Sequence, residues 1–268
     1  MLWKSGKPTP MQKWISRFMV QSSLQVNKKV ISNNAIQLNP FSGNPNDTAL
    51  LSLNEVMSNS LFFNKLSPTW GVDITDMVNS NKAYLTYGAQ SQELRDMNVR
   101  LRWNITRKYS VSVTNKFDKN DMLTPAFSNQ NYIINSFQTE PQVSYTKGTK
   151  YRLTLGCRYL QQENSSLYGG EHSLSKALTM DTKYNVVSNT SLTAHFELNA
   201  IDFSGTDQTT TVAYTMLQGL TTGTNYVWSV DLTKRLLGNI EVTLSYEGRK
   251  PGEGVTVNTG RASIRALF

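Results

Sequence analysis

The sequence predicts an all-β fold: an antiparallel, up-and-down transmembrane β-barrel of about 10–14 strands, either whole or incomplete. Three observations predict it. Apolar and polar residues alternate over many segments, which is the period-2 pattern of strands with two unlike faces. Most of these segments are as long as the roughly 9–11 residues that a membrane strand needs. Tight turns and long polar loops also alternate along the chain.

The C-terminal end shows the alternation most clearly. Apolar residues take every second position in residues 226–233, 240–247 and 260–268, and turns at 237–239 and 249–254 separate these segments. The chain ends on a phenylalanine. Alternating strands joined by turns and ending in an aromatic residue are typical of the C-terminus of an outer-membrane barrel.

The strand expected at 97–105 has the strictest pattern, because its apolar residues are separated by polar ones that include Arg100 and Arg102. The run 131–146 reads as a long strand in which Pro141 permits a change of register. The Asn-Ser-Asn run at 79–81 reads as a turn. Further strands are expected at 61–63, 70–75, 83–89, 109–117, 151–159, 171–186 and 192–200.

The connections have their own regularity. A barrel is expected to have tight turns on the periplasmic side and long loops on the extracellular side. The tight turns are at 106–108, 147–149, 188–190 and 237–239, and the long loops are at 118–130, 161–170, 202–224 and 249–254. The longest loop contains a less regular piece at 212–220. Trp103, Tyr109 and Tyr151 lie next to tight turns, where interfacial aromatic girdles would lie.

Two regions follow from this reading: an N-terminal segment, 1–57, of poorly defined strands and loops, and barrel strands over 58–268. The first twenty residues contain four basic residues and two prolines but no continuous apolar core of a signal peptide. We therefore expect the chain to be the C-terminal part of a longer protein.

Composition excludes several other classes. A hydrophobic content of 38% and a mean hydropathy of −0.40 do not fit a helical membrane protein. The formal charge of +8 permits an acidic partner, but many basic residues alternate along strands, so no nucleic-acid partner is expected. The single cysteine, Cys157, cannot form an intramolecular disulfide or a Cys-based metal site.

The polar positions of the strands predict a charged lumen. Two readings stay open: Arg–carboxylate pairs that fill the interior, or a basic lining that attracts anions. The predicted lumen-facing charges are Arg100, Arg102, Lys116, Arg152, Arg158, Glu197, Glu241, Arg261 and Arg265.

No catalytic, cofactor or metal site is predicted. A serine-hydrolase site needs a serine, a histidine and an acid at matching heights, and the only histidines are His172 and His195. His195 and Glu197 share a face but lack a third metal ligand, and no G-x-S-x-G element exists.

Four segments, 216–220, 225–228, 246–250 and 259–268, resemble the C-terminal barrel region of large outer-membrane proteins of Bacteroidota. The resemblance implies a location in the bacterial outer membrane, with outer-membrane lipid around the barrel and a soluble domain or partner protein upstream. It also implies a β-signal, read by the barrel-assembly machinery. That signal comprises Gly260, Ala262, Ile264, Ala266 and Phe268.

Three functions fit the sequence. The first is a membrane anchor or a structural or assembly component of the outer membrane. The second is a channel or transporter for small solutes, with anions among the candidates. The third is a soluble β-sandwich surface domain. Lumen width separates the first two, because about 8 strands fill with side chains whereas 16–18 leave an aqueous channel.

Overall fold

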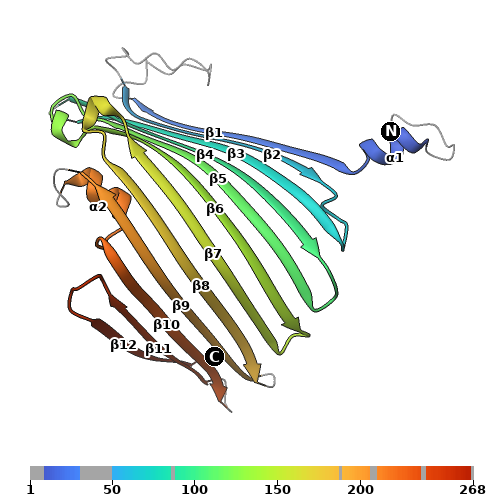
Figure 1. Cartoon of the computed structure of the whole chain (residues 1–268). Helices are drawn as coiled ribbons and strands as arrows, with labels where there is room; N and C mark the ends of the chain where they lie inside the picture. Colours follow the sequence, from blue (N-terminus) through green and yellow to red (C-terminus); the bar gives the residue numbers. More distant parts are fainter. Residues whose placement is uncertain are drawn as a thin grey trace.

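The computed structural model describes residues 9–30, 50–85, 88–186, 189–205, 210–236 and 240–266. Twelve strands form one sheet in which every pair is antiparallel and neighbours in the sequence are neighbours in space (Figure 1). In chain order the elements are α1 (Pro10–Ile15), β1 (Phe18–Val30), β2 (Leu50–Phe63), β3 (Trp70–Leu85), β4 (Gly88–Asn104), β5 (Tyr109–Leu123), η2 (Ser128–Gln130), β6 (Tyr132–Lys147), β7 (Tyr151–Asn164), η3 (Ser166–Tyr168), β8 (His172–Val186), β9 (Thr190–Ser204), α2 (Thr211–Leu217), β10 (Gly223–Leu236), β11 (Ile240–Lys250) and β12 (Val257–Ala266).

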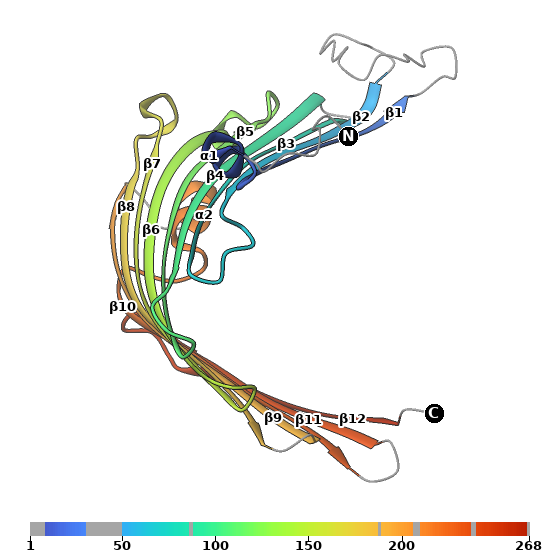
Figure 2. The same ribbon diagram turned by 90° about the vertical axis from the view of Figure 1, so that its right-hand side faces the viewer.

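The expected all-β, up-and-down antiparallel fold is confirmed. The third alternative, a β-sandwich of two sheets, is wrong, because all twelve strands of the described residues belong to one sheet. That sheet is strongly curved, with β1 and β12 at the two ends of the arc (Figure 2). Among the described residues β1 pairs with β2 alone and β12 with β11 alone, so the sheet is open, as an incomplete barrel would be.

The two faces of the sheet are identified by α2, which lies in the hollow of the curve (Figure 2). Its buried side chains pack on Tyr132 and Ile134 of β6 and on Ile201 of β9. These positions and those opposite them in register therefore belong to the concave face. Residues between them belong to the convex face, because side chains alternate along a strand.

The sheet has two unlike ends. We call the end with the connections at 64–69, 105–108 and 148–150 the turn end. The opposite end, called here the loop end, carries η2, η3 and the segment that contains α2. The tight turn expected at 237–239 and residue 188 of another lie outside the described residues. No described helix is long and apolar enough to cross a membrane.

Several strands extend further than the sequence pattern predicts. The turn expected at 79–81 is wrong, because these residues continue β3 and Asn79 accepts a hydrogen bond from Asn54 of β2 at 3.5 Å. The polar runs after 117 and 160 begin as strand, since β5 continues to Leu123 and β7 to Asn164. Polar side chains in these runs belong to strand ends rather than to loops.

Most of the described N-terminal segment also belongs to the sheet. Residues 18–30 form β1, and the boundary predicted between 57 and 58 lies inside β2. β1 pairs with β2 from Phe18 opposite Phe63 to Lys29 opposite Ser52, and the register shifts only at Val30.

Pro141 does not change the register of β6, although a proline would permit it. The pairing with β5 runs unbroken through Pro141 opposite Val113. On the β7 side the pairs skip from Thr139–Tyr159 to Gln142–Gly156, and the register is the same on both sides of the gap. Proline lacks a backbone N–H, so the missing donor interrupts one ladder locally without moving the strand.

Candidate functional site

The convex face of the sheet is apolar along most of its height. Val143, Leu155 and Leu178 lie on β6, β7 and β8 at its centre, and each is half or more exposed, with Leu155 at 50%. Cys157, also on this face, is an exposed free thiol. Soluble monomers rarely expose contiguous apolar patches larger than a few hundred Å². This face therefore requires apolar surroundings.

Aromatic side chains border the convex face at the turn end. The ring centroids of Phe18 and Phe63 are 4.7 Å apart, those of Phe63 and Trp70 are 5.4 Å apart, and those of Tyr109 and Tyr145 are 5.1 Å apart. Such belts lie at membrane–water interfaces. We call this row the turn-end girdle; it comprises Phe18, Phe63, Trp70, Trp103, Tyr109, Tyr145, Tyr151 and Tyr184, from β1 to β8.

The turn-end girdle does not follow a straight line of paired residues. Trp103 is opposite Val111, but the next ring belongs to Tyr109, two residues closer to the turn. Tyr145 is opposite Tyr109, and the row then moves by two residues again to Tyr151. A regular stagger of this kind is what tilted barrel strands require if the girdle is to lie in one plane.

A second aromatic border lies closer to the loop end. Phe117 and Phe137 are paired in register, and their ring centroids are 5.1 Å apart. From Tyr109 to Phe117 the strand rises about 26 Å at roughly 3.3 Å per residue. At a tilt of about 40° this gives about 20 Å along the membrane normal, close to the apolar band of about 25 Å found on outer-membrane barrels.

The concave face is polar and nearly balanced in charge. By register its described strand residues include eleven basic and nine acidic side chains, so the excess of basic side chains is small. The concave face of the described strands is therefore not strongly basic. The basic residues are Lys29, Arg100, Arg102, Lys116, Arg152, Arg158, Lys183, Arg235, Arg249, Arg261 and Arg265; the acidic ones are Asp73, Asp96, Asp118, Glu140, Asp181, Glu197, Asp231, Glu241 and Glu247.

All nine charged residues expected to face a lumen lie on this concave face, as the two lists show. The structure gives them different surroundings. Arg102 donates from Nη2 to the carbonyl oxygens of Lys65 and Ser67, each at 3.3 Å, and so holds the β2–β3 connection. Arg261 and Arg265 lie on β12, an exposed edge strand.

Arg158 and Glu197 form the most buried ion pair of the concave face, between Nη2 and Oε1, with side chains 22% and 13% exposed. The pair spans β8, where Ala177 is opposite Arg158 and Thr179 is opposite Glu197, and both of these small residues are buried. Glu197 also accepts from Asn199 Nδ2 at 3.3 Å. The ion pair thus joins β7 to β9 across β8.

His195 extends this network. Its Nδ1 lies 2.7 Å from Asp181 Oδ1, and its Nε2 lies 3.9 Å from Glu197 Oε2. Ser229 is opposite His195 in register, but within the described part of the chain no hydrogen bond joins His195 to a serine. The arrangement is an acid–histidine–acid row without an activated nucleophile. The described residues contain no group of three or more His, Cys, Asp or Glu that could hold a metal ion.

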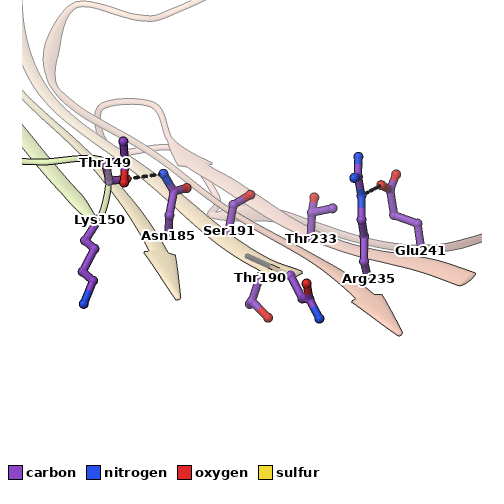
Figure 3. A pocket seen from close by; sticks show the side chains of 9 residues that line it. Thr149, Lys150, Asn185, Thr190, Ser191, Thr233, Arg235 and Glu241 are labelled. Carbon is purple, nitrogen blue, oxygen red and sulfur yellow. Dashed lines mark hydrogen bonds and ion pairs between the residues drawn. The ribbon is translucent and has the colours of Figure 1, made fainter. Parts of the chain in front are cut away.

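A polar hollow of about 620 Å³ lies on the sheet near the turn end (Figure 3). Asn185 Nδ2 donates to the Thr149 carbonyl oxygen at 2.6 Å on one side of it. Arg235 Nε pairs with Glu241 Oε2 at 3.2 Å on the other side, and this places the expected Glu241 in an ion pair. Ser191 lies between these two contacts. The lining offers hydroxyl and amide groups, the Arg235–Glu241 pair and the ammonium group of Lys150.

The loop end is covered on the concave side by α2. Thr210 caps the helix by accepting from Ala213 N at 3.1 Å. Val212, Ala213, Met216 and Leu217 are buried against β6 and β9. The sequence does contain the signal for this helix, because these four residues have the i, i+1, i+4, i+5 spacing of a helix face. The irregular piece expected at 212–220 is thus mostly helix.

Asn225 joins two loops at the same end. It is fully buried, and its Oδ1 accepts from the backbone N–H groups of Thr221 at 3.2 Å and Gly252 at 3.1 Å. Its Nδ2 donates to the carbonyl oxygens of Thr221 at 2.8 Å and Gly223 at 3.1 Å. One amide side chain therefore holds the connection after α2 against the β11–β12 connection. Sequence reasoning missed this role, because a lone Asn near the start of a strand carries no distinguishing pattern.

Comparison with known proteins gives limited guidance. No protein-family model matches the chain, and neither does any curated protein. The beta domain of the Bordetella autotransporter BrkA is similar at 9% identity and a TM-score of 0.37, over 81% of this chain and 91% of that domain. The translocator domain of the autotransporter NalP from Neisseria meningitidis gives 11% identity, a TM-score of 0.37, and coverage of 94% and 88%.

OmpT, an outer membrane protein of Vibrio cholerae, is similar at 8% identity and a TM-score of 0.38, over 93% of this chain and 92% of that protein. Likeness this weak transfers no property to the present chain.

Proposed function

We propose that the chain is an integral β-barrel protein of the bacterial outer membrane whose main role is that of a membrane anchor or structural component. The observation that carries the membrane placement is the separation of the two faces. One face is apolar and bordered by aromatic rings, and the other holds twenty charged side chains, counting eleven basic and nine acidic. Lipid on one side and a polar interior on the other would satisfy both faces.

The anchor role is supported by what occupies the concave face. α2 packs into the hollow through an apolar cluster with Tyr132, Ile134 and Ile201. Arg158 pairs with Glu197, and Asp181 contacts His195. These polar groups bind each other and are therefore less available to bind a solute. The nearly balanced charge and the packed helix favour a concave face whose side chains stabilise the sheet over one that conducts solutes.

Assembly would use the C-terminal strand. Gly260, Ala262, Ile264 and Ala266 lie on the convex face of β12, and the remaining residue of the predicted β-signal, Phe268, lies outside the described residues. An exposed edge strand with an alternating apolar face is suited to pairing with another strand. We propose the barrel-assembly machinery as its partner, and a further domain or partner protein upstream.

A solute channel is the second candidate. The polar hollow of about 620 Å³ near the turn end favours it, because such a lining could hydrate a passing solute. The small excess of basic residues gives little basis for strong anion selectivity.

Two measurements test the proposal. Purified chain should need detergent or lipid to stay monodisperse, and a monodisperse chain in plain buffer would rule out the membrane placement. Protein refolded into a planar bilayer should give no steady ionic conductance. Reproducible single-channel steps would replace the anchor role with the channel.

A further inference from the structure

The short helix α1 presents an apolar face that the described chain covers only in part. Met11, Trp14 and Ile15 have the i, i+3, i+4 spacing of one helix face, and Phe18 follows at the start of β1. Met11 is 71% exposed and Trp14 is 54% exposed, and no residue of α1 is buried. This face is more apolar and more exposed than a helix end in water would be expected to tolerate.

The helix is nevertheless well formed at its start. Thr9 and Gln12 make a reciprocal capping box: Gln12 N donates to Thr9 Oγ1 at 3.3 Å, and Thr9 N donates to Gln12 Oε1 at 2.8 Å. Pro10 occupies the first helical position. Helices shorter than about 12–15 residues are marginal in water without such a surface to pack on. A helix this short therefore needs a surface to cover its apolar side.

The apolar face of α1 continues the turn-end girdle. The ring centroid of Trp14 lies 4.9 Å from that of Phe18 and 6.2 Å from that of Phe63. The backbone is tied there as well, because Asn64 N donates to the Arg17 carbonyl oxygen at 3.0 Å. α1 is thus held at the border where the convex face meets the turn end.

The charge on this segment is of one sign. Lys13 lies in the last turn of α1 and Arg17 directly follows it, and both are exposed. Residues 9–30 and the adjoining connection 64–69 contain no aspartate or glutamate. Basic side chains beside exposed tryptophan and aliphatic residues are typical of helices that lie in the headgroup region of a membrane.

We propose that α1 is an interfacial anchor that lies on the phospholipid leaflet at the turn end and binds its phosphate-bearing headgroups. Met11, Trp14 and Ile15 enter the boundary between headgroups and acyl chains, and Lys13 and Arg17 contact phosphate. Through Phe18 the helix fixes the free edge strand β1 to the membrane surface. This inference rests on the proposed membrane placement of the sheet.

The test uses nitroxide labels on the full chain, refolded into vesicles of phosphatidylethanolamine and phosphatidylglycerol. In a Cys157→Ser background, single labels are placed at Met11→Cys, at Leu155→Cys in the centre of the convex face and at Tyr214→Cys on the exposed side of α2. Accessibility to oxygen and to a water-soluble nickel chelate then gives the depth of each label. The Met11 label should lie between the deep Leu155 label and the aqueous Tyr214 label.

The outcomes separate the two proposals. If the Met11 label is as accessible to nickel as the Tyr214 label while Leu155 is shielded, the sheet is in the membrane and the anchor inference is wrong. If Leu155 is also accessible to nickel, the membrane placement fails and the anchor falls with it. A Met11 label that is immobile and shielded from both oxygen and nickel in the vesicles would indicate a protein surface instead of lipid, and would also overturn the inference.

Charge variants test the headgroup contact. Lys13→Gln and Arg17→Gln should each lower the ratio of membrane-docked to undocked Met11 label about fivefold in vesicles with phosphatidylglycerol, and by less in phosphatidylcholine alone. Arg107→Gln with Lys108→Gln removes two charges from another turn at the same end and is the matched control. An equal loss of docking in the control, or no loss in the α1 variants, would contradict headgroup binding by these two residues.

Discussion

The Arg158–Glu197 pair should be energetically coupled, and its coupling can be measured apart from the rest of the concave face. Replacing Glu197 by leucine leaves the guanidinium of Arg158, 22% exposed, without its carboxylate. Removing one partner of a fully buried pair costs about 3–5 kcal/mol, and partial exposure places this change at the lower end, about 3 kcal/mol. Arg158→Met should cost less, about 2 kcal/mol, because Glu197 keeps its hydrogen bond from Asn199.

The double variant should cost no more than the roughly 3 kcal/mol of Glu197→Leu alone, since it leaves neither charge unpaired. That gives a coupling energy of about 2 kcal/mol or more, within the range for residues in one network. The assay is equilibrium unfolding in guanidinium of protein refolded in phospholipid vesicles, followed by tryptophan fluorescence. The matched control is the same double-mutant cycle on Arg235 and Glu241, a pair at 3.2 Å whose arginine is 68% exposed.

The control pair should show a coupling below about 1 kcal/mol, because exposed ion pairs are screened and lose side-chain entropy. Equal coupling energies in the two cycles would refute the reasoning that burial of a pair on the concave face sets its coupling energy. A stabilising Glu197→Leu single variant would refute it more directly, since Arg158 would then have no need of its partner.

Three further changes have defined outcomes. Ala213→Asp places a carboxylate at a fully buried site of α2 and should undock the helix from the sheet. Single-channel current should then appear in planar bilayers. Tyr214→Asp, on the exposed side of α2, is the control and should give no current. Asn225→Ala should destabilise the loop end by about 2–4 kcal/mol, read as faster limited proteolysis after α2, because two loops lose their shared amide. Leu155→Arg should cost about 2–4 kcal/mol in vesicles if it faces the bilayer centre, whereas Thr154→Arg, on the opposite face, should cost much less; equal costs would contradict the face assignment.

The strand pattern could be predicted from sequence because the two faces meet such different surroundings. Period-2 alternation is strict where both faces are long and continuous, as in β4 over 97–104. The alternation pattern gives a wrong prediction where residues of turn composition form part of a strand. The Asn-Ser-Asn run at 79–81 has turn composition, yet it lies within β3 because Asn79 belongs to a face where amides bond across strands.

The concave network could be predicted only in part. Periodicity places Arg158 and Glu197 on one face, but their contact joins residues 39 positions apart on strands that are not neighbours. It depends on register in two ladders and on the small side chains of Ala177 and Thr179 between them. Packing of α2 against β6 and β9 is likewise a long-range event, although its helical spacing is visible in the sequence.

Strand number and stagger together limit how this sheet could close. β1 begins at the turn end and β12 finishes there, so the two free edges run antiparallel. They could pair directly or through an even number of further strands, and either closure keeps the up-and-down order. The turn-end girdle moves by two residues between β4 and β5 and by two again between β6 and β7, which is the stagger of tilted strands. Because closure must preserve this stagger, cysteine cross-links between β1 and β12 should form in one register only, and cross-links in several registers would show that the two edges do not meet in a closed barrel.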